Sequence, residues 1–388
     1  MVIHMRIAMI GHKRIPSREG GVEIVVEELA VRMAAQGHDV TVYNRGGHHV
    51  AGKENDSRKK SREYRGVRII TIPTSSKKAL NAILYATLAT IHALFGHYDV
   101  IHYHAEGSCA LLWLPHFFGI RTVATIHGLD WQRSKWGGFA TRFLLFGEKM
   151  AAKYADEVIV LSQNVQTYFQ NTYHRQTRYI PNGITIPELR TADRITKEYG
   201  LYQEHYLLFL ARIVPEKGLH YLIDAYRELD TDMPLVIAGG SSHTEEYMEE
   251  ITKKAAMDTR IVMTGFVQGK RLEELYSNCY LYVLPSDIEG MPLSLLEAMS
   301  YGRMCLCSDI AENKETAGEQ ANYFKHSDVA DLRKQLELLL VNTEKKETIT
   351  NTGYTMEKTD ARKKYVAEHF DWNEVVDKTV KLYNKRVD

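Results

Sequence analysis

The chain has 388 residues, 44% of them apolar and 25% charged, which are the proportions of a soluble globular protein. Its 49 Lys and Arg residues balance 49 Asp and Glu residues, and its length is long for one core and natural for two domains. Its four cysteines are scattered, with one C-x-C at Cys305 and Cys307. We expect small buried thiols on one face of a strand, no metal, and a reduced, cytoplasmic compartment.

Composition also argues against a secretory signal and a membrane span. Residues 1–10 are too short for a signal and lead directly into polar sequence. The most apolar window, Ala79–Phe95, contains an asparagine, two threonines and a histidine. We therefore expect a buried helix there rather than a spanning one.

The neutral total hides opposite charges in the two halves. Residues 1–187 carry 23 Lys and Arg against 14 Asp and Glu, and the remainder carries 26 against 35. Such asymmetry indicates that the first half meets something anionic. The alternative is that two oppositely charged domains simply attract each other.

The first residues predict the β-α-β opening of an open α/β sheet, whose ligands bind at the carboxyl ends of strands. Residues 5–10 and 38–43 have the pattern of strands, and residues 22–36 have that of a helix. The loop before this helix ends in Gly20-Gly21 and lacks G-x-G-x-x-G, so we infer no dinucleotide cofactor. A glycine pair lets backbone approach a ligand, although turn geometry alone could also require it.

Charged residues 53–65 then predict an exposed loop. Further strands are expected at residues 67–72, 100–104 and 122–126, with a helix at residues 79–95. His127-Gly128 follows the last of these strands directly. A lone histidine is usually structural, but at a strand's carboxyl end a ligand-facing role is equally plausible.

Residues 133–153 combine five Lys and Arg residues with tryptophan, phenylalanine and leucine. A basic helix of this composition can lie on an anionic membrane surface. Core packing with a solvated basic edge would give the same pattern, and both interpretations stay open.

After a strand at residues 158–161, a turn at Tyr179–Gly183 and a linker at Ile184–Arg190, the alternating pattern restarts. Strands are expected at residues 207–210, 235–238, 261–264 and 281–284. The ends of these strands carry Arg212–Gly218, Gly239-Gly240, Gly265-Phe266 and the stretch Glu289–Glu297. Four ligand-type features on one sheet edge indicate a binding site more strongly than any one alone.

The stretch Glu289–Glu297 begins on a strand-to-helix turn, with Pro292 suited to the first helical position. The helix start favours a ligand's negative charge, and two carboxylates can accept from several hydroxyls. The natural ligand is therefore a phosphorylated sugar, and an ordinary turn followed by a helical glutamate is the alternative. Asp230-Thr231-Asp232 resembles a metal-binding D-x-D, but it precedes its strand, so we interpret it as a surface turn.

These residues together resemble the retaining glycosyltransferases of family 4, which have the GT-B fold. The resemblance rests on the E-x7-E of Glu289 and Glu297, the R-x4-K of Arg212 and Lys217, the Gly20-Gly21 loop and His127-Gly128. It implies two Rossmann-like parallel-sheet domains facing across a cleft. The expected domains are residues 1–185 for the acceptor and 186–368 for the donor, with a final helix at 369–388 returning to the first domain.

The resemblance also implies roles for single residues. Arg212 and Lys217 would stabilise the leaving diphosphate, and Glu289 would hold the donor sugar, with His127 facing the reacting centre. Further donor-binding residues are expected at Gly239, Gly240, Gly265, Phe266, Val267, Gly290, Met291, Pro292, Leu293 and Glu297. The acceptor side is expected to use Gly20, Gly21, Glu23 and Asp130.

A narrower likeness is to bacterial rhamnosyltransferases of capsule and polysaccharide assembly, which use a deoxythymidine diphosphate sugar. It rests on Ile15-Pro16, Gly20–Glu23, Thr125–Trp131 and Glu289–Glu297. Pro292 departs from the commoner glycine and removes one backbone donor. Other members of the broad family use uridine or guanosine diphosphate sugars, so the donor stays open.

No carboxylate stands out as a covalent nucleophile, so we expect front-face displacement with retention, and neither metal nor cofactor. The partners would be a nucleotide-sugar donor and a saccharide or lipid-linked acceptor at the inner membrane face, with no nucleic acid. A nucleotide-sugar epimerase and a non-catalytic membrane scaffold are the competing interpretations.

Overall fold

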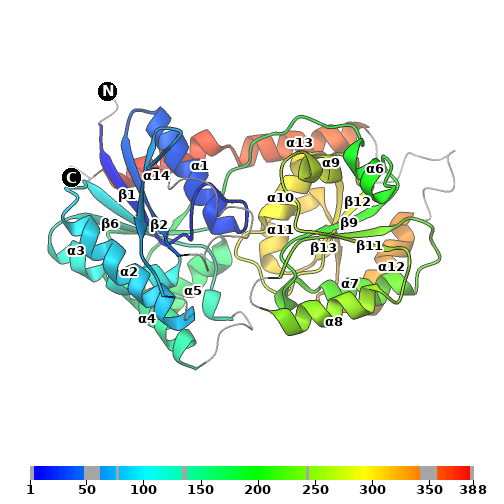
Figure 1. The fold of residues 1–388 in the computed structure, drawn as a ribbon, viewed down its shortest axis with the longest axis horizontal. Coiled ribbons are helices and arrows are strands. Elements are labelled where there is room, and N and C mark those ends of the chain that lie inside the picture. The colour runs from blue at the N-terminus through cyan, green and yellow to red at the C-terminus, as the bar shows by residue number, and fades with distance from the viewer. Residues whose placement is uncertain are drawn as a thin grey trace. The chain divides into compact units, whose positions relative to one another are not determined.

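The protein forms two compact units, shown in a computed structural model (Figure 1). The structure describes residues 4–47, 62–75, 78–132, 138–241, 244–340 and 356–384. Unit 1 comprises Met1–Gly183 together with Trp372–Asp388, and unit 2 comprises Ile184–Asp371. Each unit is an α/β domain built on its own sheet.

Unit 1 contains a sheet of eight strands among its described residues, in the order β3-β4-β2-β1-β5-β6-β7-β8. All neighbouring strands run parallel except β3, which pairs antiparallel with β4. The strands are β1 (Arg6–Ile10), β2 (Asp39–Arg45), β3 (Glu63–Tyr64), β4 (Val67–Ile72), β5 (Val100–His104), β6 (Arg121–Ile126), β7 (Glu157–Val160) and β8 (Arg178–Tyr179). The central strands β1 and β5 are buried along almost their whole length, as expected of parallel strands covered on both faces.

Helices cover both faces of this sheet (Figure 1). They are α1 (Gly21–Ala35), α2 (Lys78–Leu94), α3 (Trp113–Phe117), α4 (Phe139–Tyr154), α5 (Gln163–Tyr173) and α14 (Trp372–Tyr383), with short 3-10 helices η1 (Glu106–Leu111) and η2 (Asp130–Gln132). Helices α1 and α14 lie on one face, and α2, α3, α4 and α5 lie on the other.

Two local expectations for this half need correction. The charged loop expected at residues 53–65 contains strand β3 near its end, because Glu63-Tyr64 pairs with β4, and residues 53–61 lie outside the described residues. Helix α2 is not wholly buried. Its inner face, including Tyr85 and Ala89, packs in the core, while Leu84 and Ile91 are exposed. No helix in the described ranges has the length and apolar character needed to cross a bilayer.

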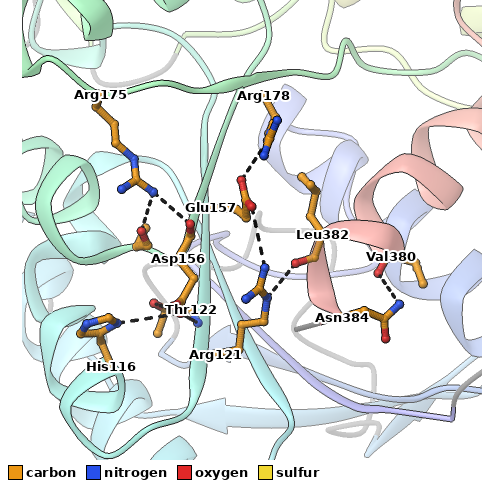
Figure 2. Close-up of polar contacts among 11 residues, drawn as sticks. His116, Arg121, Thr122, Asp156, Glu157, Arg175, Arg178, Val380, Leu382 and Asn384 are labelled. Atoms are coloured by element: carbon orange, nitrogen blue, oxygen red, sulfur yellow. Dashed lines mark hydrogen bonds and ion pairs between the residues drawn. The ribbon is translucent and has the colours of Figure 1, made fainter. Parts of the chain in front are cut away.

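Helix α14 packs on unit 1 through polar contacts that Figure 2 shows at its carboxyl end. The Arg121 guanidinium donates through Nε to the Leu382 carbonyl (2.8 Å) and pairs with Glu157 (3.8 Å). A cation near a helix carboxyl end satisfies terminal carbonyls and complements the helix dipole. Further along the helix, Gln36 donates to Asp377 (2.9 Å). The helix therefore belongs structurally to the first unit, although the whole second unit precedes it in the chain.

Unit 2 contains a sheet of six parallel strands among its described residues, in the order β11-β10-β9-β12-β13-β14. They are β9 (Leu207–Leu210), β10 (Leu235–Ala238), β11 (Ile261–Gly265), β12 (Leu281–Leu284), β13 (Met304–Ser308) and β14 (Asn322–Phe324). The sequence pattern predicted the first four strands, and the C-x-C predicted the strand that is β13, but β14 was missed. Cys305 and Cys307 are both buried in β13 and pack in the same cluster, so the predicted placement of these thiols is confirmed.

The described α-helices of unit 2 are α6 (Arg194–Tyr199), α7 (Leu219–Arg227), α8 (Glu245–Ala255), α9 (Lys270–Asn278), α10 (Leu293–Ser300), α11 (Ala311–Ala317), α12 (Val329–Leu340) and α13 (Met356–His369), with short 3-10 helices η3 (Pro215–Lys217) and η4 (Gly318–Gln320). Apolar residues of α7, α8 and α12 form the core on one face of the sheet. Residues of α9, α10 and α13 form the core on the other face. Strands β9, β10 and β11 are added outward on one side of the sheet, and β12, β13 and β14 are added outward on the other side. The direction in which strands are added therefore reverses between the neighbours β9 and β12.

Candidate functional site

The reversal between β9 and β12 creates a topological switch point, the place where open α/β sheets bind ligands. Strand β9 leads into residues 211–218, and β12 leads into residues 285–292. The two loops meet at Gly218, whose φ is +64°. A Cβ at this position would overlap the Pro285 carbonyl oxygen, so only glycine permits the approach.

Lys217 and Glu289 form an ion pair across these two loops. Their side chains are only 13% and 6% exposed, and Ser286 Oγ donates to the same Glu289 oxygen at 2.7 Å. Lys217 is presented by a single 3-10 turn, Pro215–Lys217, that ends at Gly218. The sequence pattern singled out both residues, and the structure brings them together at the switch point.

Arg212 lies half-buried on the loop that follows β9. Next to it, the Ile213 amide donates to the Gly240 carbonyl (3.0 Å), which joins this loop to the one after β10. Gly239 has a φ of +153°, and a Cβ there would overlap the Ala211 carbonyl oxygen. The Gly239-Gly240 pair therefore lies against the backbone on either side of Arg212, which explains why glycine is needed at Gly239.

The loop after β11 reaches the same edge. The Gly239 amide donates to the Gly265 carbonyl at 2.9 Å, and Gly265 has a φ of +70°. Phe266 is 50% exposed, whereas the Val267 side chain is buried in the core. Any ligand contact at Val267 would therefore come from its backbone.

The stretch that begins helix α10 is arranged nearly as predicted. The helix starts at Leu293, so Pro292 is the residue before its first turn rather than inside it. Gly290 is buried, and the partly buried Met291 packs against the core. Glu297, on the helix itself, accepts a hydrogen bond from Tyr276 OH at 3.0 Å. The E-x7-E thus places one carboxylate beside Lys217 and the other beside a tyrosine hydroxyl.

Unit 1 has its own switch point, between β1 and β5. Gly11, directly after β1, has a φ of +132°, and a Cβ there would overlap the His104 carbonyl oxygen. The following loop is held by a carboxylate, since Glu23 accepts from the Lys13 amide at 2.9 Å. Gly20 caps helix α1, and Gly21 is its first residue.

His127 lies directly after β6 and contacts His104, which in turn packs against His102. Its Nε2 is 3.1 Å from His104 Nδ1, and the His104 and His102 rings lie 4.1 Å apart. Burial lowers the pKa of His102 to about 3. Burial, together with the neighbouring histidines, lowers the pKa of His104 well below its ordinary value. These two rings are therefore neutral near pH 7.

No sequence pattern singled out Glu106, which lies beside the predicted residue Asp130. Glu106 is completely buried, and its Oε1 accepts from the Asp130 amide at 2.8 Å. Burial and then the Asp130 carboxylate raise the pKa of Glu106 well above its ordinary value. The available signal was position, because Glu106 follows the Val-Ile-His-Tyr-His strand at the same edge as His127.

The basic segment expected at residues 133–153 is described from Gly138 onward, and residues 133–137 lie outside the described residues. Helix α4 buries Leu144 and Glu148, and Glu148 accepts from three aromatic side chains, Trp131, Tyr168 and Tyr173 (2.6–3.1 Å). Its outer face exposes Phe139 and Phe146, as well as charged residues.

Comparisons with known proteins agree with this architecture. A family model described as "Glycosyltransferase Family 4" matches residues 19–186, and one described as "Glycosyl transferases group 1" matches residues 192–356. An uncharacterized glycosyltransferase of Methanocaldococcus jannaschii is 25% identical over 98% of both chains.

Solved structures show the same fold. Sucrose-phosphate synthase from Thermosynechococcus elongatus has a TM-score of 0.80 at 21% identity, covering 98% of both chains. Anabaena HepE, solved with UDP-glucose, has a TM-score of 0.77 at 17% identity, covering 97% of this chain and all of that one.

The protein is therefore a glycosyltransferase with the GT-B fold, and the predicted α/β class with two parallel-sheet domains is confirmed. Within this class, its first unit carries the Glycosyltransferase Family 4 domain, and its second unit carries the Glycosyl transferases group 1 domain.

Proposed function

We propose that the protein transfers a sugar from a nucleotide diphosphate donor to a saccharide or lipid-linked acceptor, with retention at the anomeric carbon and without a metal. The observation that carries this proposal is the buried Lys217–Glu289 pair at the switch point of unit 2. It places an ammonium and a carboxylate where a parallel sheet binds its ligand, so one ligand can meet both.

The two charges suit the two ends of a nucleotide sugar. Departure of the nucleotide diphosphate leaves negative charge, which Lys217 and the nearby Arg212 would stabilise. Each such donor is typically worth ~3–4 kcal/mol in the transition state. Glu289 would accept from hydroxyls of the donor sugar, and Ser286 already donates to this carboxylate in the same manner.

The other donor contacts follow from the loops on the same edge. Backbone at Gly290–Leu293 would complete the sugar site, and Glu297 would accept from the ribose hydroxyls. Gly239-Gly240 would line the nucleotide pocket. Phe266 is well placed to border the base, because half of its surface is exposed beside Gly265.

Unit 1 would supply the acceptor side. We assign His127 to the reacting centre, and Gly20-Gly21 and Asp130 to acceptor contacts. Glu23 would act through the loop, since its carboxylate already holds the Lys13 amide. With no protein nucleophile assigned, retention would follow from front-face displacement, in which the leaving phosphate accepts the acceptor's proton.

Substitution of the ion pair tests the proposal. Lys217→Ala and Glu289→Ala should each abolish acceptor-dependent release of nucleotide diphosphate while leaving the chain folded. The exposed pair Lys253–Glu249 offers the matched control, because Lys253→Ala removes an ammonium from the same unit away from the switch point. Near-normal turnover in either ion-pair variant would exclude that residue's role.

The donor itself is proposed to be deoxythymidine diphosphate rhamnose, for capsule or other surface polysaccharide. Uridine or guanosine diphosphate hexoses are the alternative, and the structurally similar HepE was solved with one uridine donor, UDP-glucose. Thermal stabilisation across a panel of these donors decides between them, since a ligand that binds only the native state raises its Tm. Conversion of the donor into its epimeric nucleotide sugar in the absence of acceptor, with no net release of nucleotide diphosphate, would instead favour an epimerase.

Exposed aromatic residues on unit 1 support contact with an anionic membrane. Helices α2, α3 and α4 lie side by side, and Phe117 and Phe118 at the end of α3 are 68% and 70% exposed. Phe139 and Phe146 are exposed on α4. Amphipathic surfaces of this kind bind the headgroup region of anionic lipid. We therefore place the enzyme in the cytoplasm at the inner membrane face. Phe117→Ser with Phe118→Ser should reduce sedimentation with phosphatidylglycerol vesicles.

A further inference from the structure

A buried path of side chains joins the C-terminal helix of unit 1 to His127. Tyr383 OH, on α14, lies 2.6 Å from His102 Nδ1, and His102 Nε2 lies 2.7 Å from Thr125 Oγ1. The His102 ring packs against the His104 ring, and His104 Nδ1 lies 3.1 Å from His127 Nε2. We infer that Tyr383, His102 and His104 are positioning residues for the His127 imidazole. This inference rests on the proposed role of His127 in sugar transfer.

The side chains of this path are held in place because they are buried from solvent. His102 and His104 have no exposed surface, and Tyr383 is 3% exposed. With both histidines neutral, each ring carries one N–H and one acceptor nitrogen. The hydrogen bonds then have only a few consistent directions, and the neighbouring groups select among them.

The partner of Tyr383 determines the tautomer of His102. Within the described residues, His102 Nδ1 is the hydrogen-bond partner of the Tyr383 hydroxyl. Because a buried hydroxyl hydrogen needs an acceptor, Tyr383 donates to Nδ1. The His102 proton therefore lies on Nε2 and is donated to Thr125 Oγ1.

The environment of His104 determines which of its ring nitrogens carries the proton. Its Nε2 is buried and has no hydrogen-bond partner in the described part of the chain. An orphaned buried N–H is rarer than an orphaned acceptor, so the His104 proton lies on Nδ1. It is donated to His127 Nε2, which makes that nitrogen an acceptor and places the proton of a neutral His127 on Nδ1. The hydrogen bond from His104 thus sets both the ring orientation and the tautomer of His127.

Kinetics of three variants test this assignment. His104→Phe keeps a ring but removes the donor. We expect kcat for transfer to fall roughly 10-fold, the lower end of the loss seen when the partner that orients a metal-binding histidine is removed. Donor and acceptor KM should stay within about twofold, since the substrate-binding groups are untouched. His104→Asn, which retains an N–H near the Nδ1 position, should restore part of the loss. Tyr383→Phe should lower kcat less, because it acts through two rings.

Gln36→Ala is the matched control, because it removes a different contact of the same helix, that of Asp377. Its kcat should equal that of the parent chain. Wild-type kcat in His104→Phe, or an equal loss in Gln36→Ala, would overturn the positioning role.

A spectroscopic readout keeps this inference separate from the proposed function. In the full-length chain labelled with ¹⁵N-histidine, His127 should show protonated Nδ1 and unprotonated Nε2, and this pattern should change in His104→Phe. An unchanged His127 pattern overturns the inference even if sugar transfer is established. If no donor is turned over, the role of His127 in transfer fails, while the altered pattern would still establish that His104 orients the ring.

Discussion

The switch points of the two units have the same topology but differ in the charge of their buried side chains. In unit 2, the loops after β9 and β12 bring Lys217 and Glu289 into a buried pair of full charges. In unit 1, strand β5 instead carries the buried side chains of His102 and His104, whose pKa values are lowered by burial. Each edge requires a glycine for close backbone approach, Gly218 in one and Gly11 in the other.

Under the proposed function, this difference would match the different charges of the two substrates. A nucleotide sugar brings a diphosphate, so its site needs formal charges to balance it. An acceptor hydroxyl brings no charge, so the proposed acceptor site needs hydrogen-bonding groups rather than a buried pair of full charges. The same backbone framework therefore serves both, and the side chains at the strand ends decide which substrate each edge can take.

The largest expected effect comes from a substitution that would force apart the two loops at the switch point of unit 2. In Gly218→Ala, the added Cβ would overlap the Pro285 carbonyl, and we expect a loss of ~3 kcal/mol or more in unfolding free energy together with loss of transfer. Denaturant titration and donor-dependent thermal stabilisation measure both.

The control is Gly200→Ala. Gly200 has a nearly identical φ of +67°, but its Cβ would meet no atom within 4 Å. This variant should cost about 1 kcal/mol, the strain of the left-handed backbone alone. Equal losses in both variants would show that the approach of the two loops is not what requires Gly218.

Acidification should weaken unit 1 more than unit 2. Burial lowers the pKa of His12 to about 4, and that of His102 to about 3. The unfolded chain therefore binds these protons first as pH falls below about 6.5, and stability is lost from there toward the folded pKa values. At pH 5 the loss is about 2 kcal/mol for each histidine.

Hydrogen exchange followed by mass spectrometry reports the two units separately. Peptides from β1, β5 and β6 should lose protection between pH 7 and pH 5, after correction for intrinsic exchange rates. Peptides from β9 and β12 are the internal control. A larger loss of protection in unit 2 would contradict the contrast between the two edges.

The smallest effect on stability is expected in the glycine loop of unit 1. In Gly20→Ala, the added Cβ would overlap only the end of the Glu23 side chain, which can move away. The Glu23 hydrogen bond to the Lys13 amide would be weakened, at a cost of about 1 kcal/mol. Donor affinity should be unchanged, while acceptor KM should rise because the loop is less well held. An altered donor affinity would contradict the assignment of this loop to the acceptor.

Sequence patterns predicted the features that depend on local chain order. Strand–loop–helix alternation was sufficient to identify two parallel-sheet units. Residues at strand ends indicated Arg212, Lys217 and Glu289 as candidate site residues, and their roles stay predictions. The pairing of Lys217 with Glu289 was beyond reach, because it depends on β9 and β12 being neighbours in the sheet.

The misses have similar causes. Strand β14 has only three residues, and its identity rests on pairing with β13 rather than on its own periodicity. Glu106 follows Ala105, whose φ of +65° turns the chain sharply after β5. Alanine does not predict such a turn, so the sequence could not place the buried Glu106 carboxyl beside Asp130.

The position of helix α14 bears on how the molecule is made. Unit 1 is the first to leave the ribosome, yet Trp372–Tyr383 comes after all of unit 2. At usual translation rates, about 190 residues correspond to roughly 10 to 40 s, during which the face of β6 that receives this helix waits uncovered. Unit 2 can therefore complete its own sheet and cores before unit 1 receives helix α14.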